Sequence, residues 1–193
     1  VHYVWLKMPE YPDAHSKKRI VSWFLFAWKL LSLNKIIPVK PSAIIYSSPS
    51  LVGFLGAKVL ASKLKSKLAF EVRDIWPLSL VELGGFSIRH PFIRLLQWVE
   101  DLAYKRSDKL FSNLKFSVDH MVSRGADVEK FCWVPNGYSK DDVETKQSVP
   151  ESILAKIPKD KFIVGYTGTL GVANALDNLL EAANILREHQ DFV

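Results

Sequence analysis

The chain has 193 residues, a single cysteine and a formal net charge of +6 at pH 7. This length provides one full domain, or one domain and part of another. The lone Cys132 excludes an internal disulfide, and the five histidines are too scattered for a structural zinc site, so no metal is expected.

Charge is divided unevenly along the chain. Residues 1–70 hold 11 Lys and Arg against 2 Asp and Glu, whereas residues 71–193 hold 15 against 18. The basic first part predicts an anionic partner, which is membrane lipid, a phosphorylated substrate or nucleic acid. The chain starts at Val1 rather than Met, and Phe192-Val193 is typical of the opening of a strand. We therefore expect both ends to be truncations of a longer protein.

The first 139 residues alternate between β-favouring and helical patterns. Strands are predicted at residues 1–6, 43–46, 68–72, 109–111 and 132–134, the second of them as a buried strand. Helices are predicted at residues 17–33, 50–65, 90–106 and 116–124, the last closed by Gly125. Strands that alternate with helices indicate βαβ units, so the expected fold class is α/β with a parallel sheet.

The helical pattern at residues 17–33 combines basic and aromatic side chains. Lys17, Lys18 and Arg19 precede an apolar run of about 14 residues, whereas a membrane-spanning helix needs about 20. Three interpretations stay open: a core or interdomain helix, a helix lying in the membrane surface, and a spanning helix. In the second, Trp23 and Trp28 would sit among headgroups and the basic residues would meet anionic lipid. No nucleic-acid-binding motif is present, so no nucleic-acid partner is expected.

Charged residues interrupt the third predicted strand at its carboxyl end, where open α/β sheets bind ligands. By the period of two, Glu71 and Arg73 share one face, and Asp74 points to the other face or into the loop. One interpretation is an Arg–carboxylate pair that closes the sheet. The other is a polar pocket in which Asp74 acts as a base or binds a sugar hydroxyl and Arg73 holds a phosphate. The apolar stretch 78–85, with its glycine pair, is expected to be a loop that could cover a ligand.

A second domain is predicted after residue 139. Residues 140–161 are polar and contain two prolines, as is typical of a linker. A β-favouring run from Phe162 then meets a loop with Gly165, Gly168 and Gly171, followed by a helical pattern at residues 175–186. Strand, glycine loop and helix start together favour phosphate, because main-chain N–H groups and the helix dipole attract an anion. A plain βα turn is the alternative.

The glycine spacing bears on which phosphate ligand is expected. The loop reads G-x-x-G-x-x-G rather than the dinucleotide pattern G-x-G-x-x-G, and Asp191 precedes an apolar run instead of ending one. The Gly-Lys-Ser/Thr of a Walker loop is absent. A nucleotide-sugar diphosphate therefore stays open, whereas a nicotinamide cofactor does not fit.

Five segments of the chain resemble family-4 glycosyltransferases, and most closely the bacterial WbuB-like group of surface-polysaccharide enzymes. They are Val72-Arg-Asp-Ile-Trp-Pro-Leu-Ser, Glu82-Leu-Gly-Gly, Trp98-Val-Glu-Asp-Leu-Ala-Tyr, Trp133-Val-Pro-Asn-Gly and Gly165-Tyr-Thr-Gly-Thr-Leu-Gly-Val-Ala-Asn-Ala-Leu-Asp. The resemblance covers nearly all of this chain, which corresponds to about half of a family member. It implies two Rossmann-like domains with helices on both faces of each sheet. Residues 1–139 would then form the acceptor-side domain, residues 140–161 the linker and residues 162–193 the start of the nucleotide-sugar-binding domain.

The resemblance also implies roles for individual residues. Gly168, Thr169, Leu170 and Gly171 would lie against the donor diphosphate. Arg73 and Asp74 would be catalytic, although many relatives carry a His there. Glu71, Trp76 and Glu82 would line the acceptor side, and Asn136 and Gly137 would form the turn into the hinge. The family's first glycine-rich loop would precede residue 1, and its donor-side Arg/Lys pair and Glu-x7-Glu element would follow residue 193. We therefore expect the 193-residue chain to be inactive by itself.

The expected function is transfer of a sugar from a nucleotide diphosphate to a lipid-linked or saccharide acceptor, in the synthesis of bacterial surface polysaccharide such as lipopolysaccharide O-antigen. Family members of this kind typically retain anomeric configuration and need neither metal nor cofactor beyond the nucleotide-sugar. We expect a cytoplasmic protein, peripheral on the inner face of the membrane. Two alternatives are a UDP-N-acetylhexosamine 2-epimerase of the same fold and a non-catalytic membrane-associated partner.

Overall fold

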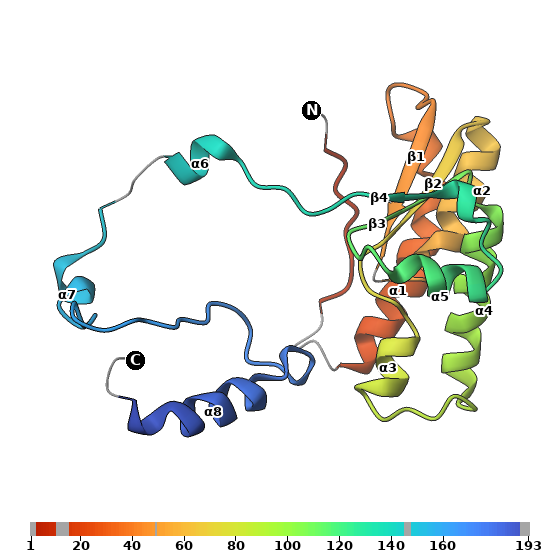
Figure 1. The fold of residues 1–193 in the computed structure, drawn as a ribbon. Helices are drawn as coiled ribbons and strands as arrows, with labels where there is room; N and C mark the ends of the chain where they lie inside the picture. The colour runs from red at the N-terminus through yellow and green to blue at the C-terminus, as the bar shows by residue number, and fades with distance from the viewer. Residues whose placement is uncertain (1–2, 11–15, 49, 145–147, 190–193) are drawn as a thin grey trace. The chain divides into compact units, whose positions relative to one another are not determined.

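The computed structural model describes residues 3–10, 16–48, 50–144 and 148–189, and the chain divides into two units, Val1–Asn136 and Gly137–Val193 (Figure 1). The first unit holds a four-stranded, fully parallel sheet in the order β1-β2-β3-β4. The strands are β1 (Ala43–Ser47), β2 (Lys67–Val72), β3 (Lys109–Ser112) and β4 (Phe131–Trp133). The expected α/β fold with a parallel sheet flanked by helices is confirmed.

The helices of the first unit follow the predicted order. They are α1 (Lys17–Leu30), η1 (Leu33–Lys35), α2 (Gly53–Leu64), α3 (Leu78–Glu82), α4 (Pro91–Arg106), α5 (Ser117–Ser123) and η2 (Val128–Lys130). Local chemistry sets their ends. The His90 Nδ1 accepts the Phe92 amide at 3.2 Å and Pro91 opens α4. Gly125, with φ +88°, follows the end of α5, where a side chain would be strained.

The helices pack on one face of the sheet. Phe70, at the centre of β2, contacts Phe54 of α2 with ring centroids 5.4 Å apart and Tyr104 of α4 at 6.2 Å. Figure 1 shows α2 and α4 on the same side of the strands. Met121 of α5 belongs to the same buried cluster. The core therefore lies between these helices and the strand residues that point to the same face of the sheet as Phe70.

The opposite face of the sheet is open in the described part of the chain. Ile45 of β1 is 63% exposed, Phe111 of β3 is half-buried, and Val134, which follows β4, is 53% exposed. These residues, with Glu71 and Ser112, line a hollow of about 310 Å³. The expectation that residues 43–46 form a buried strand is therefore wrong for this face, because the described helices cover only the other one. Helices on both faces are not seen among the described residues.

Helix α1 belongs to the core through one of its sides. Leu30 is buried, and Trp23, Phe26 and Ala27 pack against the core cluster. Gly56 of α2 allows a close approach, since a Cβ there would lie 2.3 Å from the Ala27 carbonyl oxygen. The interpretation of residues 17–33 as a core helix is thus confirmed for this side. No helix in the described ranges is both long and apolar enough to cross a bilayer.

Two local predictions in the first unit are wrong. Residues 3–6 form no strand, because no neighbouring strand supplies hydrogen bonds and Tyr3 and Trp5 are largely exposed; residues 1–2 lie outside the described residues. The stretch 78–85 is not a loop throughout. It contains α3, whose first turn is anchored by the Ser79 Oγ donating to the Ile75 carbonyl oxygen at 2.8 Å.

The second unit carries short helices and no strand among its described residues, apart from an isolated bridge at Phe162. Its helices are α6 (Lys140–Glu144), α7 (Glu151–Leu154), η3 (Val172–Asn174), α8 (Leu176–Ile185) and η4 (Leu186–Glu188). The helix predicted from residue 175 is present as α8. The predicted strand after Phe162 is not formed at residues 163–167, because a strand needs a paired neighbour along its length. The predicted feature at Asp191 and Phe192-Val193 lies outside the described residues.

Candidate functional site

The carboxyl edge of the sheet gathers polar residues from three strands. The Ser48 Oγ accepts the Arg73 amide at 2.9 Å and joins the ends of β1 and β2. The Ser112 Oγ donates to the Val72 carbonyl oxygen at 2.8 Å and accepts the Leu114 amide at 3.1 Å, which joins β2 to β3. The first and second of these bonds hold both polar groups of the peptide that joins Val72 to Arg73, so the Arg73 side chain projects from a held backbone.

Arg73 and Asp74 are exposed at this edge. Among the described residues neither side chain takes part in a salt bridge. The Arg–carboxylate pair that the sequence left open is therefore not formed here. A guanidinium and a carboxylate on consecutive residues, both exposed to solvent, can bind an anion and a hydroxyl group respectively.

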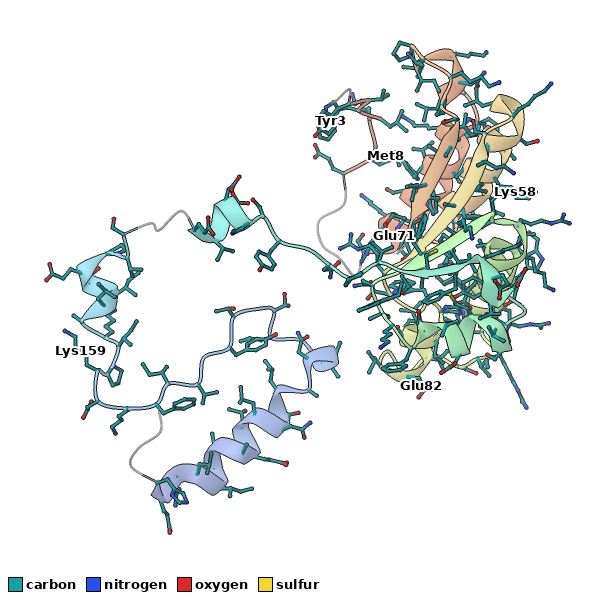
Figure 2. The ribbon with its side chains drawn as sticks, turned by 45° about the horizontal axis from the view of Figure 1, so that its top comes forward. Tyr3, Met8, Lys58, Glu71, Glu82 and Lys159 are labelled. Carbon is teal, nitrogen blue, oxygen red and sulfur yellow. The ribbon has the colours of Figure 1, made fainter. Side chains whose placement is uncertain are left out.

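Glu71 and Glu82, both predicted on the acceptor side, occupy different places (Figure 2). The Glu71 carboxylate accepts a hydrogen bond from the Ser47 hydroxyl on the open face of the sheet. Glu82 lies on α3 and lines, together with Asp74 and Leu114, a hollow of about 260 Å³. The structure therefore brings Asp74 and Glu82 to one hollow, and it places Glu71 in another.

Trp76 faces the helices rather than solvent. Its ring meets Trp23 of α1 edge-on with centroids 5.7 Å apart, and Trp23 in turn stacks on Phe92 of α4 at 6.2 Å. The peptide bond between Trp76 and Pro77 is cis. Trp76 thus connects the carboxyl edge to α1, a contact that the sequence patterns do not predict.

The residues expected to contact a membrane point in different directions. Trp28 is 72% exposed and Lys18 is exposed, whereas Trp23 packs inward. The Arg19 guanidinium carbon lies over the Trp23 ring at 5.5 Å. The side chain of Lys17 lies outside the described residues. A membrane surface would therefore meet Lys18 and Trp28 but not Trp23.

The glycine loop of the second unit is held through the Thr169 carbonyl oxygen. It accepts the Tyr166 hydroxyl at 3.0 Å, the Asn174 Nδ2 at 2.6 Å and the Gly171 amide at 3.0 Å. The amides of Gly168, Thr169 and Leu170 donate to no acceptor in the described residues. Three neighbouring N–H groups of the predicted phosphate loop are thus open to an anion, whereas that of Gly171 is occupied.

Several polar residues at the carboxyl edge were missed by the sequence analysis. They are Ser47, Ser48, Ser112 and Asn113, and the Asn113 Oδ1 is buried without a hydrogen-bond partner. The sequence carries a signal for them, because Ser47-Ser48 and Ser112-Asn113 directly follow predicted strands, as Arg73 and Asp74 do. No group of three or more His, Cys, Asp and Glu side chains suited to a metal ion occurs in the described ranges.

No protein-family model and no curated protein sequence matches the chain. Among solved structures, the chain is similar to Anabaena HepE in complex with UDP and glucose, at 12% identity and a TM-score of 0.43 over 88% of this chain and 50% of that one. It is also similar to HepE in complex with UDP-glucose, at 12% identity and a TM-score of 0.38 over 77% of this chain and 46% of that one. The chain thus spans about half the length of these neighbours.

Proposed function

We propose that this chain is part of a glycosyltransferase that moves a sugar from a nucleotide diphosphate to a lipid-linked or saccharide acceptor in bacterial surface polysaccharide synthesis. The observation that carries the proposal is the position of Arg73 and Asp74. They lie at the carboxyl edge of a parallel sheet, where α/β sheets bind ligands, and they form no ion pair with the described residues. The sequence resemblance to family-4 glycosyltransferases supports the same reading.

In this proposal Arg73 and Asp74 organise the acceptor side, and Asp74 shares its hollow with Glu82. The open amides of Gly168, Thr169 and Leu170 bind the donor diphosphate. Catalysis rests on positioning and on stabilising the departing diphosphate, with retention of configuration and without metal.

The test is a transfer assay with the protein as its gene encodes it, a panel of nucleotide-sugars and a lipid-linked acceptor. We expect Arg73→Ala and Asp74→Asn each to lower transfer by about 100-fold, because each removes a group placed against the reacting sugars. The urea midpoint should not change, since both side chains are exposed. Arg106→Ala, at an exposed arginine that ends α4, is the matched control. Full transfer by both variants would refute the proposal, and product formed from a UDP-N-acetylhexosamine without acceptor would favour an epimerase.

We further propose that the protein is peripheral on the inner membrane face, with the outer side of α1 in the headgroup region. Val21, Phe24 and Trp28 are 62%, 46% and 72% exposed and follow one another at helical spacing, and Lys18 is exposed on the same helix. The test is co-sedimentation with phosphatidylglycerol vesicles. Trp28→Ser should reduce binding several-fold, whereas Trp98→Ser, a control at a 54% exposed tryptophan of α4, should not. Equal losses in both variants would contradict the assignment.

A further inference from the structure

A hollow of about 220 Å³ lies between α1 and the segment that joins β1 to α2, and the proposed catalytic residues do not line it. Its walls are Met8, Arg19, Ser22, Trp23, Phe26 and Ser50. Ser50 follows the carboxyl end of β1, so the hollow opens at the same edge of the sheet as Arg73. Trp23, on its wall, contacts Trp76 of the β2–α3 connection.

Two hydroxyl groups at this hollow are buried without a hydrogen-bond partner, those of Ser22 and Ser50. Ser22 is only 6% exposed. A helical serine commonly bonds back to the carbonyl of the preceding turn, and Ser22 does not. Buried hydroxyls are nearly always satisfied, because an unpaired one costs stability. Two such groups on one hollow therefore indicate a ligand that supplies oxygen acceptors to both.

The remaining walls define the chemistry of that ligand. Arg19 brings a positive charge and a guanidinium with five N–H donors, which can serve more than one partner. Met8, Trp23 and Phe26 form an apolar wall (Figure 2 labels Met8). At about 30 Å³ for each water in the liquid, the hollow has room for about seven waters, enough for a phosphate and a short apolar substituent.

We propose that this hollow is a binding site for the phosphate of the acceptor, with the Ser22 and Ser50 hydroxyls and the Arg19 guanidinium on its oxygens. The apolar wall receives the group that the phosphate carries. The inference deepens the proposed function, because it gives the acceptor a phosphate and a place beside α1. The phosphate belongs either to a lipid diphosphate or to a soluble sugar phosphate.

The experiment measures binding alone, with the whole chain and without any sugar donor. Tryptophan fluorescence and calorimetry follow titrations with geranyl diphosphate, glucose 1-phosphate and uncharged geraniol. We expect a phosphate probe to bind and geraniol not to bind. Tighter binding of geranyl diphosphate identifies the lipid source, and tighter binding of glucose 1-phosphate the soluble one.

The variants are Ser22→Ala with Ser50→Ala, and Arg19→Gln. Each should weaken binding of the preferred phosphate probe at least tenfold. Ser62→Ala and Lys40→Gln, at exposed positions of α2 and of the segment before β1, are the matched controls and should leave binding unchanged. The double serine variant should unfold at the same or a higher urea concentration without ligand, because it removes unpaired hydroxyls. This readout separates a binding role from a structural one.

Absence of phosphate binding at millimolar concentration, equal binding of geraniol, or unchanged affinity in both variants would each overturn the proposal. A lower urea midpoint of the double serine variant would overturn it as well. Failure of the transfer assay would not produce any of these results, since no donor is present. The two proposals can therefore fail separately.

Discussion

Replacing Gly56 by alanine tests whether α1 is fixed in the core. A Cβ at this position would lie 2.3 Å from the Ala27 carbonyl oxygen and 3.0 Å from the Leu30 Cβ. The nearest of these atoms is α1 backbone, which cannot rotate away as the end of a side chain can. The two helices must therefore separate by several tenths of an ångström.

Two opposing terms decide the sign of the effect. Alanine stabilises a helix interior by about 1 kcal/mol relative to glycine. Overpacking a core costs about 1–3 kcal/mol, and a clash with rigid backbone belongs at the upper end. We therefore expect Gly56→Ala to lower the free energy of unfolding by about 1–2 kcal/mol. With a denaturant slope of about 1–3 kcal/mol per molar urea, the midpoint should fall by about 0.3–2 M.

The assay is urea unfolding followed by tryptophan fluorescence, with Trp23 of α1 near the altered contact. Ser62→Ala is the control, because it raises helix propensity at an exposed position of the same helix and should stabilise the protein slightly. An alanine at position 56 that stabilises as much as this control would show that α1 does not pack against α2 as described.

Three further predictions concern stability and donor binding. Burial raises the pKa of Tyr46 to about 12, so the native state keeps a proton that the unfolded chain loses above pH 10. The free energy of unfolding should therefore fall by up to about 1.4 kcal/mol per pH unit from pH 10 towards 12. Urea unfolding across this range should show a smaller fall with pH for Tyr46→Phe. Glu100 is 1% exposed and accepts a hydrogen bond from the Tyr104 hydroxyl at 2.7 Å. Glu100→Ala should therefore lower the free energy of unfolding by about 3 kcal/mol in the same assay. A loss below about 1 kcal/mol would contradict a stabilising role of this buried hydrogen bond. A valine at Gly168 would crowd the loop of open amides, since even a Cβ at this position would lie 2.7 Å from the Tyr166 hydroxyl. Gly168→Val should therefore weaken nucleotide-sugar binding at least tenfold, as measured by calorimetry. Unchanged affinity would count against a phosphate loop.

Much of the first unit follows from local sequence patterns. The strands β1 to β4 each begin and end within one residue of the predicted positions, because short apolar runs are bounded by polar residues or proline. Their parallel direction follows from the helices between them. Their side-by-side order is not contained in such patterns, since it depends on long-range pairing.

Other features depend on which groups meet in space. The residues at 78–82 gave no helical signal of their own, and the first turn of α3 is held by the Ser79 hydroxyl on the Ile75 carbonyl oxygen. The run 43–46 has the composition of a buried strand, yet Ile45 is exposed because the described helices lie on the other face. Composition reports that a side chain can be buried, and only the surrounding elements decide whether it is.

The same distinction applies to the candidate site. Charged residues inside an apolar strand end gave a local signal for Arg73 and Asp74, whereas Ser22 is an ordinary helical serine in the sequence and Ser50 an ordinary loop residue. The two serines become candidate ligand-binding residues only in the folded chain, where α1 lies against the segment after β1 and both hydroxyls have no hydrogen-bond partner. Trp23 then contacts Trp76, so α1, read from the sequence as a membrane or core helix, also forms a wall at the carboxyl edge. One helix can therefore serve both proposals, because its outer side, with Phe24 and Trp28, faces away from the side that lines the hollow.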